Sequence, residues 1–313
     1  MLYGSRGERF LAKIAVELQQ ALARRALNGA PGQTTAYRLS QGEGWTVSDV
    51  ICTSGPQDRP FEEQHDRVNL AIVIAGSFQY HSAGGCELMT SGALLLGNCG
   101  QSFECGHEHA PGDRCISFGY TVEYFEQLAF DAGDQNARRS FKVLRLPPLR
   151  ELSPIVARAC AGLAGSADAP CSDIAWEEIS LQLAARAVQL AGSIAPKPGD
   201  APPSAIARVT RAVRRIERHP DDGVSLASLA REAGLSPYHF LRTFERLTGV
   251  TPHQYVLRMR LREAAVRLAL EPAKVLDVAL DCGFGDVSNF NRSFRAEFGA
   301  SPRGYRRQSS AST

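Results

Sequence analysis

The chain has 313 residues, more than one ordinary hydrophobic core accommodates, so its length predicts two domains with their connections. Hydrophobic residues make up 44% and charged residues 22%, which are values of a globular protein. No apolar run approaches the roughly 20 residues that span a bilayer, and residues 1–10 carry no secretion signal. We therefore expect a cytoplasmic protein with no membrane partner.

The net charge of +2 is unevenly distributed along the chain. Residues 205–313 contain 18 lysines and arginines against 11 acidic residues, a net charge of +7. Residues 1–204 contain 17 against 22, a net charge of −5. A basic C-terminal end is expected when one domain faces a polyanion such as DNA.

The hydrophobic period changes within the N-terminal half. Residues 8–28 carry apolar side chains every three or four positions, which predicts a helix that ends at Asn28. From Thr34 to Tyr120, short runs rich in β-branched and aromatic residues alternate with glycine-containing turns, which predicts a β-sandwich or small barrel. The predicted strands are residues 45–52, 68–75, 78–81, 93–96 and 114–120.

Two further helices are predicted at residues 148–163 and 172–190. The second carries an apolar stripe that either packs in the core or forms the helix-to-helix seam of a homodimer. Four prolines within residues 195–203 then predict a semi-rigid linker. The stripe consists of Trp176, Ile179, Leu183, Ala187 and Leu190.

A repeat at an offset of 50 residues is the most informative pattern in the C-terminal segment. Because the pattern extends over seven positions, it indicates that one supersecondary unit is used twice. The first copy contains Phe240, Arg242, Phe244, Gly249, Thr251, Pro252 and Tyr255, and the second contains Phe290, Arg292, Phe294, Gly299, Ser301, Pro302 and Tyr305.

Each copy is predicted to form a helix, a tight turn and a second helix. In the first copy, Ser225 and Ser236 are the expected N-caps on either side of a turn at Gly234. In the second copy, residues 282–285 form the turn and Asp286 caps the helix that follows. This is the architecture of a helix-turn-helix DNA-binding motif.

A helix of roughly 18 residues, beginning at Thr251-Pro252, is predicted to join the two copies. At 1.5 Å per residue it is about 27 Å long, close to the ~34 Å between successive major grooves on one face of DNA. One protomer is therefore expected to reach two adjacent grooves.

Amphipathic spacing separates buried from DNA-facing positions on the second helix of each copy. Phenylalanines three or four residues apart are expected in the core, which leaves the residues between them for DNA. Arginine pairs with guanine and asparagine with adenine, each worth about 1–3 kcal/mol of discrimination. The alternatives for these positions are phosphate contacts, internal ion pairs and a solvated helix face. The candidate contacts are Tyr238, His239, Leu241 and Arg242 in the first copy and Ser288, Asn289, Asn291 and Arg292 in the second.

The run from Gly283 to Arg306, which includes Phe290-Asn291-Arg292 and Ser301-Pro302-Arg303-Gly304-Tyr305, resembles the C-terminal signature of the AraC/XylS family of transcription regulators. The resemblance covers residues 205–308. It implies a seven-helix domain with two helix-turn-helix units that binds double-stranded DNA and activates transcription through RNA polymerase. Leu241 departs from the family pattern, which is often polar there, so it is expected to contact a thymine methyl group or to add little specificity.

The same resemblance implies a cupin-like N-terminal domain that binds a small-molecule effector inside its barrel. The predicted fold class is therefore α+β multidomain: a cupin-like β-sandwich or barrel, a helical linker, and an all-α domain with two helix-turn-helix units. The predicted divisions are an N-terminal helix at 1–30, the cupin-like domain at 31–146, linker helices for dimerisation at 147–194, a proline-rich linker at 195–204 and the DNA-binding domain at 205–313.

Eight cysteines without a CxxC pair fit buried thiols, metal ligands or redox sensors better than a disulfide framework. If residues 103–109 are extended, one face carries a thiolate and two imidazoles, a competent set for zinc or another soft divalent metal. A fourth ligand would come from Cys99 or Cys115. The alternatives are a thiol sensor, or core thiols with histidines at a pocket rim. The predicted metal set is Cys105, His107, His109 and Cys115.

Two other classes of protein fit the sequence less well. A cupin-type metal-dependent enzyme fused to a DNA-binding domain needs more ligands than His107 and His109, and GxxxxGK, HExxH and GxSxG motifs are absent from the sequence. A methyl-accepting or metal-responsive repair regulator needs a cysteine-rich zinc module that this sequence does not match. We therefore expect a regulator and not an enzyme.

Overall fold

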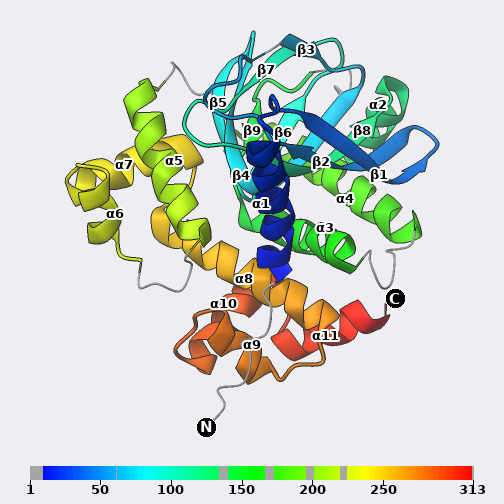
Figure 1. Ribbon diagram of the computed structural model, residues 1–313. Coiled ribbons are helices and arrows are strands. Elements are labelled where there is room, and N and C mark those ends of the chain that lie inside the picture. The colour runs from blue at the N-terminus through cyan, green and yellow to red at the C-terminus, as the bar shows by residue number, and fades with distance from the viewer. Residues whose placement is uncertain are drawn as a thin grey trace.

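The computed structural model of the chain describes residues 10–60, 62–133, 140–165, 173–194, 201–218 and 224–311 (Figure 1). None of the helices in these ranges combines the length and apolar character that crossing a membrane requires. The N-terminal part contains α1 (Phe10–Asn28), β1 (Thr34–Gly42), β2 (Trp45–Cys52), β3 (Glu62–Gln64), β4 (Val68–Ser82), β5 (Gly85–Thr90), β6 (Leu94–Gly97), β7 (Ser102–Gly106), β8 (Asp113–Tyr120), α2 (Val122–Asp131), β9 (Arg145–Leu146), the 3-10 turn η1 (Arg150–Leu152), α3 (Ser153–Gly165) and α4 (Asp173–Ala191). The C-terminal part contains α5 (Pro203–Arg218), α6 (Leu226–Glu232), α7 (Pro237–Thr248), α8 (Pro252–Leu270), α9 (Val275–Asp281), α10 (Val287–Phe298) and α11 (Pro302–Ala311).

The described strands form two antiparallel arrays that share the long strand β4. The first half of β4 lies between β8 and β6 in the order β1-β2-β8-β4-β6-β9, and its second half pairs with β5 and β7. Gly76 lies where β4 passes from one array to the other, and its φ of 81° belongs to the left-handed region. A Cβ at this position would approach the carbonyl oxygen of Gly112 to 2.5 Å, so the crossing requires glycine. The strands predicted separately at 68–75 and 78–81 are therefore one bent strand.

The apolar stripe of α4 packs inside the N-terminal part. Its aromatic member, Trp176, lies against Phe118 of β8 with ring centroids 6.4 Å apart. The Tyr120 hydroxyl, also on β8, donates a 2.9 Å hydrogen bond to the carbonyl oxygen of Ser180. Four members of the stripe are at most 2% exposed and the fifth is partly buried in the same core: Trp176, Ile179, Leu183, Ala187 and Leu190. The dimer seam predicted for this stripe is wrong, because these side chains already stabilise their own protomer.

The segment predicted as linker helices also belongs to this core. Buried residues of both α3 and α4 pack with those of β2, β4, β6 and β8. The proline-rich segment that follows lies outside the described residues from 195 to 200. The boundaries proposed at 147, 195 and 205 thus stay predictions.

The C-terminal helices form two cores, one on each side of α8. The first is built by α5, α6 and α7 with the start of α8, and the second by the remainder of α8 with α9, α10 and α11. In Figure 1, α8 runs beneath the β-rich part, with α5 to α7 on one side and α9 to α11 on the other. The fold is therefore a β-rich N-terminal domain followed by an all-helical C-terminal domain with two similar units, which confirms the predicted order of these two domains.

The two domains are in direct contact through buried groups. Arg145 of β9, whose side chain is 1% exposed, donates a 2.8 Å hydrogen bond to the carbonyl oxygen of Thr248 at the end of α7. Arg258 of α8 donates one of 2.7 Å to the carbonyl oxygen of Pro148. Apolar side chains cross the boundary as well, since Leu88 of β5 packs in the core of the first helical unit. The helical domain is thus docked on the β-rich domain.

Candidate nucleic-acid interface

The first helix-turn-helix unit is α6, Gly234 and α7. The Ser225 side chain accepts a hydrogen bond of 3.1 Å from the Ser228 backbone N–H and so caps α6. Gly234 has a φ of 65°, which a turn this tight requires. The Ser236 hydroxyl caps α7 by accepting from the His239 backbone N–H at 3.3 Å. The caps and the turn lie at the predicted residues.

The second unit, α9 to α10, repeats this geometry with a stronger cap. Gly283 has a φ of 81° in the turn. The Asp286 carboxylate accepts hydrogen bonds from the backbone N–H groups of Ser288 at 2.9 Å and Asn289 at 3.0 Å. These two bonds lower the pKa of Asp286, because they favour its charged form. The start of α10 is therefore fixed next to the residues predicted to contact DNA.

Pairs of phenylalanines attach α7 and α10 to their units. Phe240 and Phe244 are fully buried with ring centroids 5.8 Å apart, and Phe290 and Phe294 are fully buried at 5.5 Å. Each pair also contacts a tyrosine that follows it in the chain, Tyr255 or Tyr305. Because these faces are buried, the opposite faces of α7 and α10 point to solvent.

The eight predicted contact residues all lie on the outward faces of these two helices. Leu241 is half-buried, and the other seven are exposed: Tyr238, His239, Arg242, Ser288, Asn289, Asn291 and Arg292. Three of them already have side-chain partners on α7 or at its N-cap. The Arg242 guanidinium donates to the Tyr238 hydroxyl at 3.2 Å, and the His239 ring pairs with the Ser236 hydroxyl at 2.9 Å.

One groove runs between the two units. Leu241 of α7 and Asn289 of α10 both line it, together with residues in the first half of α8. Arg260 of α8 also lines the groove and donates a 3.0 Å hydrogen bond to the carbonyl oxygen of Gly283, the turn residue of the second unit. The two units therefore face a common surface and are held in place by α8.

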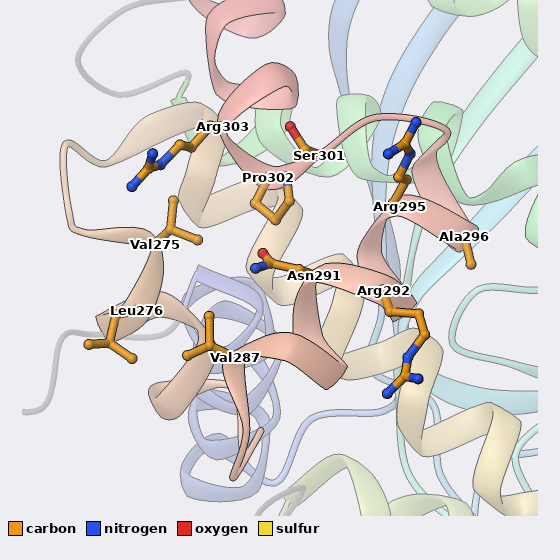
Figure 2. Close-up of a pocket in the computed structure, with 10 residues that line it drawn as sticks. All are labelled: Val275, Leu276, Val287, Asn291, Arg292, Arg295, Ala296, Ser301, Pro302 and Arg303. Carbon is orange, nitrogen blue, oxygen red and sulfur yellow. The ribbon is translucent and has the colours of Figure 1, made fainter.

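A second hollow lies beside α10 and carries basic side chains (Figure 2). Figure 2 shows Asn291 near its middle, between Val287 and Pro302, with the guanidinium groups of Arg292 and Arg303 at different edges. Arg295 lines it too. Arg295 and Arg303 were not predicted as contacts, although both stand within the sequence motif. Both side chains are exposed on this face, which the spacing from the buried phenylalanines did not indicate.

Helix α8 connects the units through buried polar contacts. Arg267 is 2% exposed and donates to Glu271 at 3.1 Å and to Asp281 of α9 at 3.0 Å. These acidic partners raise the pKa of Arg267 against the opposing effect of its burial. A charge paired in this way is costly to disrupt, so α8 and α9 are expected to move together.

The predicted metal set is not gathered in the structure. The strand β7 ends at Gly106, so the alternation that was expected to place Cys105, His107 and His109 on one face stops before both histidines. His109 lies beside Glu108, and the Cys115 thiol donates to Asp113 at 3.3 Å.

His107 instead pairs with Asp113. The distance from His107 Nε2 to Asp113 Oδ1 is 2.7 Å, and both side chains are buried. Burial acts to lower the pKa of His107, but the hydrogen bonds and charge interactions with Asp113 and Cys52 together outweigh it and raise the pKa to about 9. Asp113 precedes a predicted strand and stands in no motif, so no local pattern in the sequence marks it as a partner of His107.

A tandem helix-turn-helix on a connecting helix defines a class of DNA-binding proteins. A family model described as a helix-turn-helix domain matches residues 229–308. The chain is 40% identical over 90 residues to the probable transcriptional regulator LumQ of Photobacterium leiognathi. This match covers 29% of this chain and 36% of that protein. It is 37% identical over 92 residues to the transposon Tn10 TetD protein of Escherichia coli, covering 29% of this chain and 67% of that protein.

Among solved structures, an AraC-type transcriptional regulator from Chromobacterium violaceum aligns at 28% identity with a TM-score of 0.31, covering 33% of this chain and 91% of that one. The chain spans about a third of the length of the first curated relatives that it matches. The chain belongs to the AraC/XylS family of transcription regulators, which confirms the resemblance found in its C-terminal motif.

Proposed function

We propose that the chain is a sequence-specific transcription regulator whose α7 and α10 enter two adjacent major grooves of double-stranded DNA. The observation that carries this proposal is the common groove, because Leu241 and Asn289, one from each unit, both line it. Helices on a shared surface can meet one face of a duplex, whereas helices on opposite sides of the domain cannot.

The spacing of the units supports the same geometry. Helix α8 has 19 residues, so at 1.5 Å per residue it is about 28 Å long, near the ~34 Å between successive major grooves. Its N-terminus adjoins the first unit and its C-terminal half packs with the second. Because α8 holds the two units at a fixed separation, α7 and α10 would bind two adjacent grooves at the same time.

Docking on the β-rich domain leaves the outward faces of α7 and α10 exposed. The interdomain contacts use the C-terminal end of α7 at Thr248, and Glu297 on α10, which accepts a hydrogen bond from Ser153. Arg242 and Arg292 lie outside these contacts and are exposed. DNA could therefore bind without separation of the domains.

Within this proposal the two units differ in chemistry. Asn289, Asn291 and Arg292 on α10 offer both adenine and guanine pairings. On α7, Arg242 stacks near the Tyr238 ring at 6.0 Å and is the one charged side chain among the predicted contacts of that helix. The second unit would thus supply more base discrimination, and Leu241 would contact a thymine methyl group.

The remaining parts of the proposal concern control. A small-molecule effector bound in the N-terminal domain would regulate DNA binding, activation would act through RNA polymerase, and the protein would act as a cytoplasmic homodimer. The cupin-like character of the N-terminal domain and dimerisation by surfaces other than the α4 stripe belong to the same proposal. The direct contacts between the two domains support effector control, because a change in one domain reaches the other through buried groups.

The proposal is tested by selecting genomic fragments that the purified chain binds. We expect a common sequence, and affinity that falls steeply with salt because phosphate contacts release counterions. The matched control is the double variant R242A/R292A, which should retrieve no common sequence. Fragments without a shared sequence, or the same set from the control, would count against sequence-specific binding.

A further inference from the structure

Three buried polar residues from distant segments meet at one edge of the β-rich domain. Cys52 ends β2, His107 follows β7, and Asp113 begins β8. The pairing of β2 with β8 sets Cys52 directly opposite Asp113. One ligand atom from each residue (the Cys52 Sγ, a ring nitrogen of His107 and a carboxylate oxygen of Asp113) lies within 4.8 Å of the other two. All three residues are less than 9% exposed.

We infer that Cys52, His107 and Asp113 bind one divalent metal ion of the zinc type, and that this ion acts on the DNA-binding domain. Thiolate sulfur, imidazole nitrogen and carboxylate oxygen are the donors that zinc takes in proteins, usually four at a time in tetrahedral sites. The thiolate selects against magnesium and calcium, which prefer oxygen ligands alone.

The charges of this set suit a dication. A thiolate and a carboxylate together carry two negative charges, which one Zn²⁺ or Co²⁺ ion neutralises while the imidazole stays neutral. Buried charges require such compensation. In the structure, His107 Nε2 lies 2.7 Å from Asp113 Oδ1, within hydrogen-bond distance. On metal binding, one ring proton of His107 and the thiol proton of Cys52 would leave to solvent, so that the imidazole is neutral and Cys52 is a thiolate.

The His107 ring provides an independent indication of a ligand. Its Nδ1 is buried and makes no hydrogen bond among the residues that the structure describes. Buried ring nitrogens are normally satisfied, so an orphaned one is an unusual feature in a protein core. A water molecule can complete the tetrahedral set without adding charge, while the Cys115 thiol keeps its proton and donates to the second carboxylate oxygen of Asp113 at 3.3 Å.

The loop between two of these ligands contacts the helical domain. Arg214 of α5 donates hydrogen bonds to the carbonyl oxygens of Pro111, at 2.9 Å, and Gly112, at 2.6 Å. Gly112 is the residue next to Asp113, and its N–H donates to the carbonyl oxygen of Ser54, two residues after Cys52. An ion that fixes Cys52, His107 and Asp113 would therefore fix the carbonyl groups that Arg214 binds. This second step, from metal to DNA affinity, rests on the proposed function.

Metal binding is tested on the full-length chain after treatment with a chelator. Titration with Co²⁺ should give one ion per chain and the thiolate-to-cobalt charge-transfer absorption, and Zn²⁺ should displace it. Cys52→Ser should remove that absorption, and Asp113→Asn should weaken Co²⁺ binding at least tenfold. The matched control is Cys99→Ser, because Cys99 is exposed and outside the cluster. No stoichiometric cobalt, or the same spectrum in Cys52→Ser and the control, overturns the site.

A measurement on the unmodified chain covers the case in which Cys52→Ser does not fold. Zn²⁺ should slow alkylation of Cys52, followed by mass spectrometry of its peptide, and leave alkylation of Cys99 unchanged. Equal rates for Cys52 with and without Zn²⁺ overturn the proposal.

The coupling step is tested by measuring affinity for a selected DNA fragment with and without Zn²⁺. We expect at least a threefold change, which Arg214→Ala abolishes while the cobalt spectrum stays the same. If the metal binds but affinity does not change, the coupling is wrong and the site stands. If no DNA is bound in either state, the proposed function fails independently of the site.

Discussion

Leu241 of α7 and Asn289 of α10 line the same groove, although they belong to different helix-turn-helix units. The relationship follows from the sequence repeat. Because α7 and α10 bury phenylalanines at equivalent positions, equivalent faces of the two helices point outward. The relationship depends on α8, whose Arg260 is bonded to the turn of the second unit. Binding of DNA by both units therefore depends on the relative orientation of α7 and α10.

Arg292→Ala should lower affinity for the selected DNA by roughly tenfold or more, since a good base pairing is worth about 1–3 kcal/mol. The melting temperature should be nearly unchanged, because the side chain is exposed. Fluorescence anisotropy with labelled DNA and a thermal melt measure the two quantities. Arg186→Ala, at an exposed site on α4, is the control. A variant that melts several degrees lower would make Arg292 structural instead.

Tyr238→Phe isolates the hydrogen bond that the Tyr238 hydroxyl accepts from Arg242. The ring remains, so only the positioning of the guanidinium is lost. We expect affinity to fall severalfold and the effect to vanish in an Arg242→Ala background, as a double-mutant cycle shows for coupled residues. Equal losses in the two backgrounds would mean that Tyr238 contacts DNA by itself.

Phe294→Ala should destabilise the second helical unit by about 3–5 kcal/mol, because it removes a fully buried ring and leaves a cavity. Urea denaturation gives the free energy of unfolding. Phe130→Ala on α2, where the ring is 61% exposed, is the control and should change it by less than about 0.5 kcal/mol. Similar losses in both variants would contradict the packing described for α10.

Because His65 is buried, we expect the chain to lose stability in acid. Burial lowers its pKa to about 4, against the weaker opposing effect of Asp66, and its Nε2 lies 2.8 Å from the Tyr80 hydroxyl. Because His65 binds a proton more readily in the unfolded chain, protonation favours unfolding. The contribution of neutral His65 to the free energy of unfolding is complete above pH 6.5 and is lost as the pH falls from 6.5 to about 4. The loss amounts to about 3 kcal/mol.

Urea denaturation at a series of pH values measures this loss, with His65→Gln as the comparison. The variant should lose about 3 kcal/mol less than the unmodified chain between pH 6.5 and 4. Parallel pH profiles for the two proteins would show that another group causes the acid sensitivity.

Sequence reasoning succeeded where structure is determined locally. Ser225, Ser236 and Asp286 cap the helices as predicted, since a cap needs only the next three residues. It missed α2, although Thr121 is a cap residue and Phe125 and Ala129 are four apart and buried. In that case a recognisable signal was present and was not used.

Prediction from sequence failed where the contacting residues are distant along the chain. The joining of Cys52 to Asp113 depends on the pairing of β2 with β8, which no local pattern specifies. The stripe from Trp176 to Leu190 has the spacing of both a core helix and a dimer seam, so only the packing partner distinguishes them. That partner is the chain's own sheet.

The central claim, that α7 and α10 meet adjacent grooves on one face of DNA, is tested most directly by hydroxyl-radical footprinting on a selected fragment. We predict two protected patches on the same face, one helical turn or about 10 base pairs apart. Arg242→Ala should weaken one patch and Arg292→Ala the other. A single patch, or two patches on opposite faces of the duplex, would contradict the account.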